Sequence, residues 1–262
     1  GERPALPVAP DATDPAAPGN ALAALEGADR QALQRELTGP LQSLQSRPLA
    51  FDVVVHRRYN PEGLSRYNIV PGLVGTILTM TMVMLTSLAM TRERERGTME
   101  NLLATPVRPA EVMAGKILPY VVIGYVQLAV ILGAAWLLFQ VPMAGSVLLL
   151  LAMIGVFIVA NLGVGFTFST LARNQLQAMQ MTFFFFLPSM LLSGFMFPFR
   201  GMPRWAQWIG ELLPLTHFLR IVRGIMLKGN DLAQLAGELW PMLAFMAVAG
   251  AVALARYRQT LD

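Results

Sequence analysis

Residues 69–91 read IVPGLVGTILTMTMVMLTSLAMT, and this stretch decides the fold. It holds no Lys, Arg, Asp or Glu, and a helix needs about 20 apolar residues to cross the hydrocarbon core of a bilayer. Backbone hydrogen bonds inside lipid are made within the segment, so the stretch is predicted to be a helix. Four more stretches share this character, with Glu238 as their one charged residue: 117–139, 146–171, 178–198 and 235–255.

The composition also indicates a membrane protein: of 262 residues, 55% are hydrophobic and 14% are charged. Soluble domains carry about 25% charged residues and could not bury this much apolar surface. The chain has no Cys, which excludes disulfides, thiolate nucleophiles and cysteine metal sites. The net charge of +4 is interpreted as sidedness around membrane spans rather than as affinity for nucleic acid. We therefore predict an all-α polytopic membrane protein with five transmembrane helices.

The basic residues between the spans predict the orientation of the chain. Segment 92–116 holds five of them, loop 140–145 holds none, and the C-terminal tail holds Arg256 and Arg258. This alternation places segment 92–116 and the C-terminus in the cytoplasm. Residues 1–68 are then extracytoplasmic.

Residues 1–68 are expected to form part of an α+β extracytoplasmic domain, separate from the transmembrane domain 69–262. Its first 20 residues are rich in Pro, Ala and Asp and predict a linker or disorder. Residues 20–37 predict a short helix, and residues 51–59 a strand. No signal peptide or initiating Met precedes them. We expect an N-terminal helix and the first half of this domain to precede the chain in the intact protein, giving six spans.

The spans offer no group that could power transport or catalysis alone. None has an ionisable residue near its middle, as transporters driven by ion gradients usually need. The two histidines, His56 and His217, have no nucleophile or metal-ligand set near them in the sequence. A phosphate-binding loop is also absent from the sequence. We predict no catalytic residue, no metal site and no cofactor in this chain, so a partner would supply the energy for transport.

Segment 92–106, RERERGTMENLLATP, predicts a short amphipathic helix on the cytoplasmic side. Thr98 is a suitable N-cap, Glu100 lies in the first turn, and Pro106 ends the helix. Its apolar face consists of Met99, Leu102 and Leu103. The residues alone leave two alternatives: a lever inserted in the groove of a partner, or a helix lying on lipid headgroups.

Segment 200–234 predicts two further amphipathic helices that are too short to span the membrane. The first carries Trp205 and Trp208, and the second begins at Pro214. They are expected to lie in, or re-enter, the outer leaflet with the Trp pair at headgroup depth. In the second helix His217, Arg220 and Lys228 lie opposite the apolar residues Phe218, Ile221, Val222 and Ile225.

Five segments, in this order, resemble permease subunits of ABC-2-type transporters, in the branch of bacterial multidrug and ion exporters. They are RYNP at 58–61, IVPGL at 69–73, RERERGTMENLLATPV at 92–107, LSGFMFP at 192–198 and LPLTHFLRIVRGIMLKG at 213–229. The resemblance covers about residues 55–262. It implies a six-helix subunit of the bacterial inner membrane that pairs with a second copy or paralogue. Two ABC-type ATPase subunits, which bind ATP and Mg, would complete the complex.

The resemblance also assigns two candidate sites. The ATPase-coupling helix would comprise Glu93, Glu95, Gly97, Thr98, Met99, Glu100, Leu102, Leu103 and Pro106, with its carboxylates contacting the ATPase and its apolar residues inserted as knobs. The outer-leaflet gate hairpin would comprise Trp205, Trp208, Pro214, His217, Arg220 and Arg223; the alternative is an interfacial anchor without a gating role.

The function expected from these observations is export of a hydrophobic or amphipathic substrate, because the spans form apolar walls without fixed charge. The alternative is a non-transport scaffold or assembly factor that works through its extracytoplasmic domain. A secondary transporter is a third, weaker alternative.

Overall fold

The computed structural model describes residues 5–10, 24, 52–55, 59, 60, 62, 64–96 and 109–259. By its internal contacts the chain forms two compact units, Gly1–Asn68 and Ile69–Asp262. Helix α2 begins in the first unit and continues into the second.

The first unit contains a pair of short parallel strands, β1 (Ala5–Val8) and β2 (Asp52–Val55). Strand β2 lies inside the segment predicted to be a strand. Two strands of four residues are too few for an independently stable sheet. The predicted helix 20–37 lies outside the described residues except for position 24. The prediction of an α+β domain is therefore not supported by the described part of this unit.

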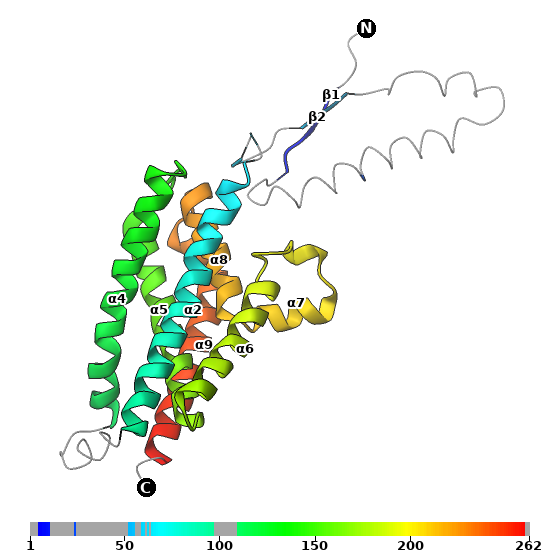
Figure 1. The fold of residues 1–262 in the computed structure, drawn as a ribbon. Helices are drawn as coiled ribbons and strands as arrows, with labels where there is room; N and C mark the ends of the chain where they lie inside the picture. The colour runs from blue at the N-terminus through cyan, green and yellow to red at the C-terminus, as the bar shows by residue number, and fades with distance from the viewer. Residues whose placement is uncertain are drawn as a thin grey trace, which may run out of the picture. The chain divides into compact units, whose positions relative to one another are not determined.

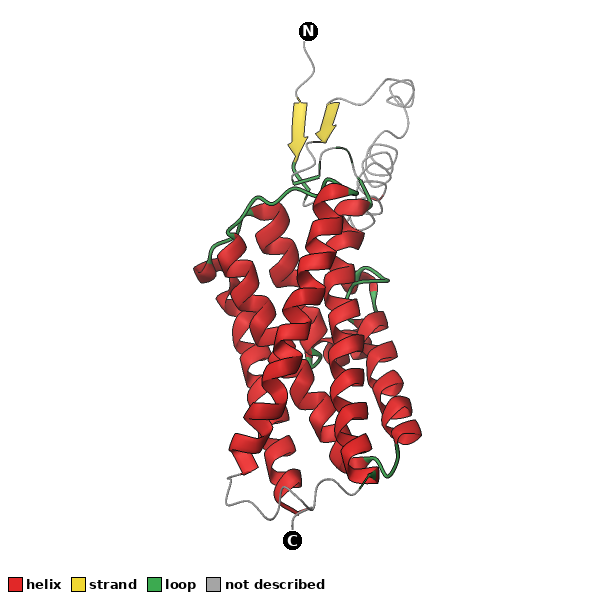
Figure 2. Cartoon of the chain, turned by 60° about the vertical axis from the view of Figure 1, so that its left-hand side comes forward, coloured by secondary structure: helices red, strands yellow, loops and turns green. Residues whose placement is uncertain are grey.

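The second unit is a helical bundle in which long helices run alongside one another (Figures 1 and 2). The long helices are α2 (Arg66–Glu95), α4 (Pro109–Leu137), α5 (Val147–Leu171), α6 (Gln175–Leu192) and α9 (Leu232–Gln259). Between α6 and α9 the chain forms shorter elements: η2 (Phe199–Gly201), α7 (Arg204–Glu211), α8 (Pro214–Arg223) and the π-helical turn η3 (Gly224–Lys228). Helix α7 lies across the direction of the long helices (Figure 1).

Within the described residues, four helices are long and apolar enough to cross a membrane: Arg66–Glu95, Gly115–Leu137, Val147–Leu171 and Leu232–Arg256. They coincide with the predicted spans 69–91, 117–139, 146–171 and 235–255 to within a few residues.

The prediction of five spans is not supported, because the predicted span 178–198 corresponds to α6, which does not qualify. Helix α6 has 18 residues and carries three glutamines in its first two turns. At 1.5 Å per residue it extends about 27 Å, against a hydrocarbon core of about 30 Å. It ends at Leu192, two residues before Gly194, whose φ is +84°. Thus the apolar run in the sequence continues beyond the end of the helix.

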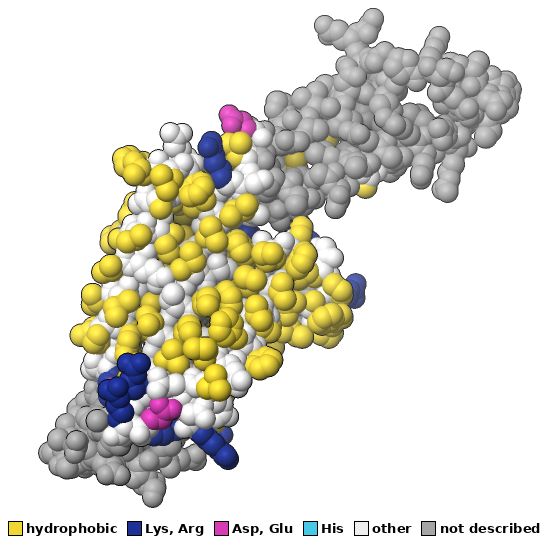
Figure 3. All heavy atoms as spheres, viewed as in Figure 1, with side chains coloured by type: hydrophobic (Ala, Val, Ile, Leu, Met, Phe, Trp, Pro, Cys, Tyr) yellow, Lys and Arg dark blue, Asp and Glu magenta, His cyan; other side chains and the backbone are white. Residues whose placement is uncertain are grey.

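The spans divide into a buried pair and an exposed pair. In the most apolar 18-residue stretch of each span, 61% of α2 and 56% of α5 is buried. The corresponding share is 11% in Gly115–Leu137 and 11% in Leu232–Arg256. Hydrophobic side chains cover much of the surface seen in Figure 3. Because these exposed side chains are apolar, lipid tails or another apolar helix surface can cover them at little cost.

Small residues allow the helices of the buried pair to approach their neighbours closely. A Cβ atom added to Gly165 of α5 would lie 2.6 Å from the carbonyl oxygen of Val83 in α2. A Cβ atom on Gly75 of α2 would lie 2.8 Å from Leu215 and 2.9 Å from Phe218 in α8. Glycine at these two positions therefore sets the spacing of α2 from α5 and α8.

We expect the substitution Gly165→Ala to lower the free energy of unfolding by about 1–3 kcal/mol, because the new methyl group meets backbone that cannot move aside. The matched control is Gly133→Ala in α4, where an added Cβ atom has no neighbour within 4 Å. That change should leave stability unchanged or raise it by up to about 1 kcal/mol through helix propensity. Thermal unfolding in detergent micelles measures both variants, and equal melting temperatures would contradict the close approach of α2 and α5.

Candidate functional site

Most of the predicted coupling helix lies outside the described residues. Its members outside the described part are Gly97, Thr98, Met99, Glu100, Leu102, Leu103 and Pro106. Glu93 and Glu95 are described, in the last turn of α2. The structure therefore shows how the chain enters this segment.

Both described carboxylates of this segment have partners within the chain. Glu93 forms an ion pair with Lys116 of α4. Glu95 accepts hydrogen bonds from the backbone N and side-chain Nε2 of Gln175, at 2.8 and 2.5 Å. Between them, Arg94 Nη1 donates to the carbonyl oxygens of Thr170 and Ala172, at 3.3 Å each. From the family resemblance, both carboxylates were expected to contact an ATPase. Their partners within the chain, Lys116 and Gln175, were not predicted.

The predicted pair of short helices in segment 200–234 is present as α7 and α8. Pro214 occupies the first turn of α8, where its fixed φ favours a helix start and its missing N–H costs no hydrogen bond. Trp205 and Trp208 of α7 are 63% and 74% exposed. Helix α7 thus presents an aromatic face to its surroundings.

Helix α8 is instead part of the core of the bundle. Its fully buried apolar side chains are Leu215, Phe218, Leu219, Ile221 and Val222. The Phe218 ring stacks on Phe157 of α5, with 3.8 Å between the ring centroids. The hairpin therefore combines an exposed helix with a helix that is fixed by apolar packing.

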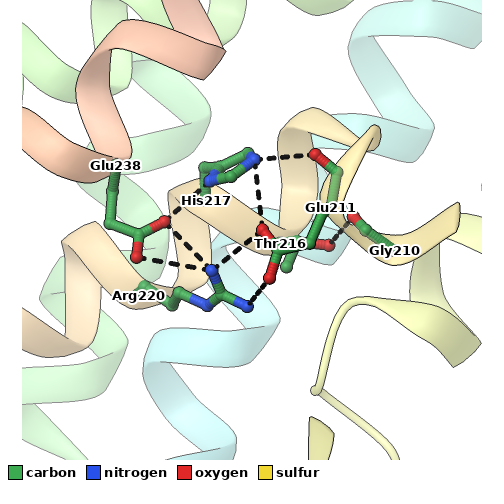
Figure 4. Close-up of polar contacts among 6 residues, drawn as sticks. All are labelled: Gly210, Glu211, Thr216, His217, Arg220 and Glu238. Carbon is green, nitrogen blue, oxygen red and sulfur yellow. Dashed lines mark hydrogen bonds and ion pairs between the residues drawn. The ribbon is translucent and has the colours of Figure 1, made fainter. Parts of the chain in front are cut away.

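A cluster of four ionisable side chains joins α7, α8 and α9 (Figure 4). His217 Nδ1 lies 2.7 Å from Oε2 of Glu238, near the start of α9. His217 Nε2 lies 2.9 Å from the carbonyl oxygen of Glu211, the last residue of α7. The imidazole, with its side chain 7% exposed, lies between acceptors on two different helices.

Arg220 contacts the same two glutamates. Its Nη2 donates to Glu211 Oε1 at 2.5 Å, and its Nη1 donates to Glu211 Oε2 at 3.1 Å and to Glu238 Oε2 at 3.2 Å. The guanidinium carbon lies 4.7 Å from the centroid of the Phe199 ring, within the range of a cation–π contact. Arg220 therefore bridges the carboxylates, while its planar face packs on the loop before α7.

The carboxylates control the protonation of the cluster. Burial alone would lower the pKa of His217, but the hydrogen bonds to Glu238 and to the Glu211 carbonyl, with the charges of both glutamates, raise it above its ordinary value of 6.5. A carboxylate and a carbonyl oxygen both accept hydrogen bonds, and an imidazole donates from both nitrogens only when it is protonated. The geometry therefore favours imidazolium at position 217.

Two more side chains of α8 form hydrogen bonds that hold the hairpin in place. Arg223 donates to the carbonyl oxygen of Gly194 from Nη1 and Nη2, at 3.4 and 3.3 Å. Thr216 Oγ1 donates to the carbonyl oxygen of Gly210 at 2.6 Å. The start of α8 is thus bonded to α7, and its end is bonded to the loop that follows α6.

The predicted residues of the hairpin do not all meet. The cluster includes His217 and Arg220, whereas the exposed Trp205 and Trp208 point outward. The partners of these two residues, Glu211 and Glu238, were not predicted from the sequence. The position of Glu238 could have indicated a polar contact, because it is the single charged residue within the predicted spans.

The charged groups of the cluster bond to one another and to a backbone carbonyl, and the imidazole can gain and lose a proton reversibly. Among the described residues, no group of three His, Cys, Asp or Glu side chains is arranged to hold a metal ion. Its chemistry is therefore that of a polar lock between helices.

Comparison with known proteins identifies the family. The profile of a family described as ABC-2 family transporter protein matches residues 1–255. The chain is 33% identical over 213 residues to the probable multidrug ABC transporter permease YbhR of Escherichia coli (strain K12), which covers 81% of this chain and 58% of that relative. It is 36% identical over 180 residues to the probable multidrug ABC transporter permease YbhS of the same strain, covering 68% and 48%.

A third relative is the inner membrane transport permease YhhJ of Escherichia coli (strain K12), 32% identical over 239 residues, covering 87% of this chain and 59% of the relative. The chain thus spans less than two thirds of the length of these relatives. The family match extends through both predicted sites and all four candidate spans. The chain belongs to the ABC-2 family of transporter proteins.

Proposed function

We propose that this chain is part of the membrane permease of an ATP-binding-cassette exporter. The observation that carries this proposal is the family match over residues 1–255. The permease would pair with a second copy or a paralogue and associate with two ATPase subunits, which bind ATP and Mg. It would reside in the inner membrane of a bacterium, by analogy with the relative YhhJ, which is named as an inner membrane transport permease.

The chemistry of the described spans supports a separate energy source. The buried polar residues of α2 and α5 are uncharged Thr, Ser and Asn side chains. Such groups bond to backbone carbonyls or across helices and carry no ion-coupled charge. An apolar path of this kind suits a hydrophobic or amphipathic substrate, which is the substrate class that we propose.

The proposed orientation follows the basic residues. The end of α2 at Glu95, with segment 97–108 after it, would face the cytoplasm, and the α7–α8 hairpin would face outward. Segment 97–106 would then dock on the ATPase through Glu100 and the apolar residues Met99, Leu102 and Leu103. Residues 1–68 would be extracytoplasmic.

The α7–α8 hairpin would act as the exit gate. The cluster of Glu211, His217, Arg220 and Glu238, which links α7 and α8 to α9, would hold it closed. Exchanging protein partners for water at these polar groups costs little net energy once water enters. Apolar contacts of α8 would keep the hairpin attached while the cluster separates.

The first prediction concerns the ATPase. In the full-length permease, Glu100→Arg combined with Leu103→Asp should abolish co-purification with a co-expressed partner ABC-type ATPase, because a charge is reversed and an apolar side chain that would insert into the ATPase becomes charged. The matched control is Asn101→Asp, which lies on the opposite face of the predicted helix. Undiminished co-purification of the double variant would contradict docking through this segment, and no co-purification of the wild type would favour the scaffold alternative.

The second prediction concerns pH. The pKa of His217 in the folded state lies above 6.5, so its stabilising effect is complete below the unfolded-state value and is lost as pH rises through the folded-state value. Protein carrying His217 should therefore lose thermal stability relative to the variant His217→Gln as pH rises from about 6 through the raised pKa of His217. Melting temperatures of both proteins, measured across this range in the same detergent, provide the test.

A matched control for this comparison is Asp231→Asn, at an exposed position just before α9. It should show the pH profile of the wild type. Parallel profiles for wild type and His217→Gln would contradict the assignment of an imidazolium to the cluster.

A further inference from the structure

Three consecutive residues at the end of α2 bond to three other helices. Glu93 pairs with Lys116 of α4, Arg94 donates to the end of α5, and Glu95 accepts from the start of α6. We propose that Glu93, Arg94 and Glu95 form a clamp that transmits movement of segment 97–106 to α4, α5 and α6. This inference rests on the proposed function, because the movement would come from the ATPase.

The Glu93–Lys116 pair connects the two helices that flank segment 97–106. The Lys116 side chain is 15% exposed and that of Glu93 is 37% exposed, so the pair is partly screened from solvent. If one partner is removed, the desolvation cost of the remaining partly buried charge is no longer compensated. Helices α2 and α4 are therefore held together at the points where the chain leaves one and approaches the other.

Arg94 binds the C-terminus of α5. The last carbonyl groups of a helix have no partner within the helix and carry its negative dipole end. Arg94 Nη1 lies 3.3 Å from the carbonyl oxygen of Thr170 and 3.3 Å from that of Ala172, the C-cap residue. A guanidinium at this position donates to the unpaired carbonyl groups and balances the negative dipole end. Displacement of Arg94 would therefore act directly on α5.

Glu95 binds the N-terminus of α6 in the complementary way. Gln175 is the first residue of α6, and its backbone N–H, which has no partner within the helix, points at Glu95 Oε1 at 2.8 Å. The positive dipole end of a helix favours a carboxylate there. Arg94 and Glu95 together therefore bond to both ends of the α5–α6 connection: Arg94 to the end of α5 and Glu95 to the start of α6.

The clamp lies at the end of a rigid helix. Helix α2 contacts α5 closely through Val83 and Gly165, and Met90 packs in a buried cluster with Phe166 of α5 and Ala253 of α9. A shift of segment 97–106 cannot be absorbed by the last turn of α2 alone, since that turn is bonded to its neighbours. The same shift would therefore reach α6, which leads to the α7–α8 hairpin.

The neighbouring arginines provide the contrast. Arg92 and Arg96 flank the clamp residues in sequence, and both are exposed, as is Glu95. The side chain of Arg96 forms no hydrogen bond or ion pair with another described residue. Arg96→Ala is accordingly the control for a lost charge in this segment.

The experiment uses the full-length permease assembled with its ATPase in lipid vesicles. This chain has no Cys, so the substitution Leu212→Cys, between α7 and α8 at a 73% exposed position, introduces a single reporter within it. The maleimide labelling rate of the reporter is measured with and without ATP plus orthovanadate. In the wild-type background we expect this nucleotide to change the rate.

Glu93→Lys and Arg94→Ala should each abolish the nucleotide-dependent change, while the ATPase still co-purifies and hydrolyses ATP. The charge swap of Glu93→Lys with Lys116→Glu should restore the change, and Arg96→Ala should retain it. Restoration by the swap also shows that the single variant had not merely misfolded.

Three outcomes would overturn the clamp. An unchanged reporter response in Glu93→Lys and Arg94→Ala would show that these residues transmit nothing. Loss of ATPase binding in Glu93→Lys that the swap does not restore would assign Glu93 to the ATPase surface. A wild-type complex that hydrolyses ATP without any reporter response would exclude transmission to the hairpin. Failure of the wild type to bind an ATPase would instead refute the proposed function.

Discussion

The need to satisfy every backbone hydrogen bond inside a bilayer shapes the rest of this structure. It makes the apolar stretches helical and confines loops, caps and charged groups to their ends. Packing among the helices then depends on shape, because lipid tails are as apolar as the side chains. This explains why Gly75 and Gly165, where an added Cβ atom would lie less than 3.0 Å from a neighbouring helix, lie in the two more buried spans.

The same constraint produces two polar networks far apart along the bundle. Glu93, Arg94 and Glu95 lie near the level of Met90 and Ala253, which share a buried cluster, whereas Glu238 lies about four turns earlier in α9. Each network joins helix ends, where unpaired backbone groups and water can stabilise charge. The proposed transport cycle uses both: a clamp at the end that receives the force and a lock at the end that opens.

Membership of the ABC-2 family fits the proposal that the permease moves the substrate while a separate subunit supplies the energy. The described spans offer an apolar interior with uncharged polar residues, and the charged residues are concentrated in connections between helices and at helix ends. A permease of this design would respond to energy delivered elsewhere. Movement from the ATPase would reach the helices through the clamp, and the cluster at the α7–α8 hairpin would open in response.

The sequence by itself determined four of the spans, the two short helices of segment 200–234 and the family, because apolar length, helical periodicity and motif order are local properties. It did not show that α6 fails to qualify as a span, since apolar residues continue past Leu192, where the helix ends and the backbone turns at Gly194. Nor could it pair Glu95 with Gln175, or Glu238 with His217 and Arg220. Those partners are distant in the chain and meet only when helices pack, so only the tertiary structure decided them.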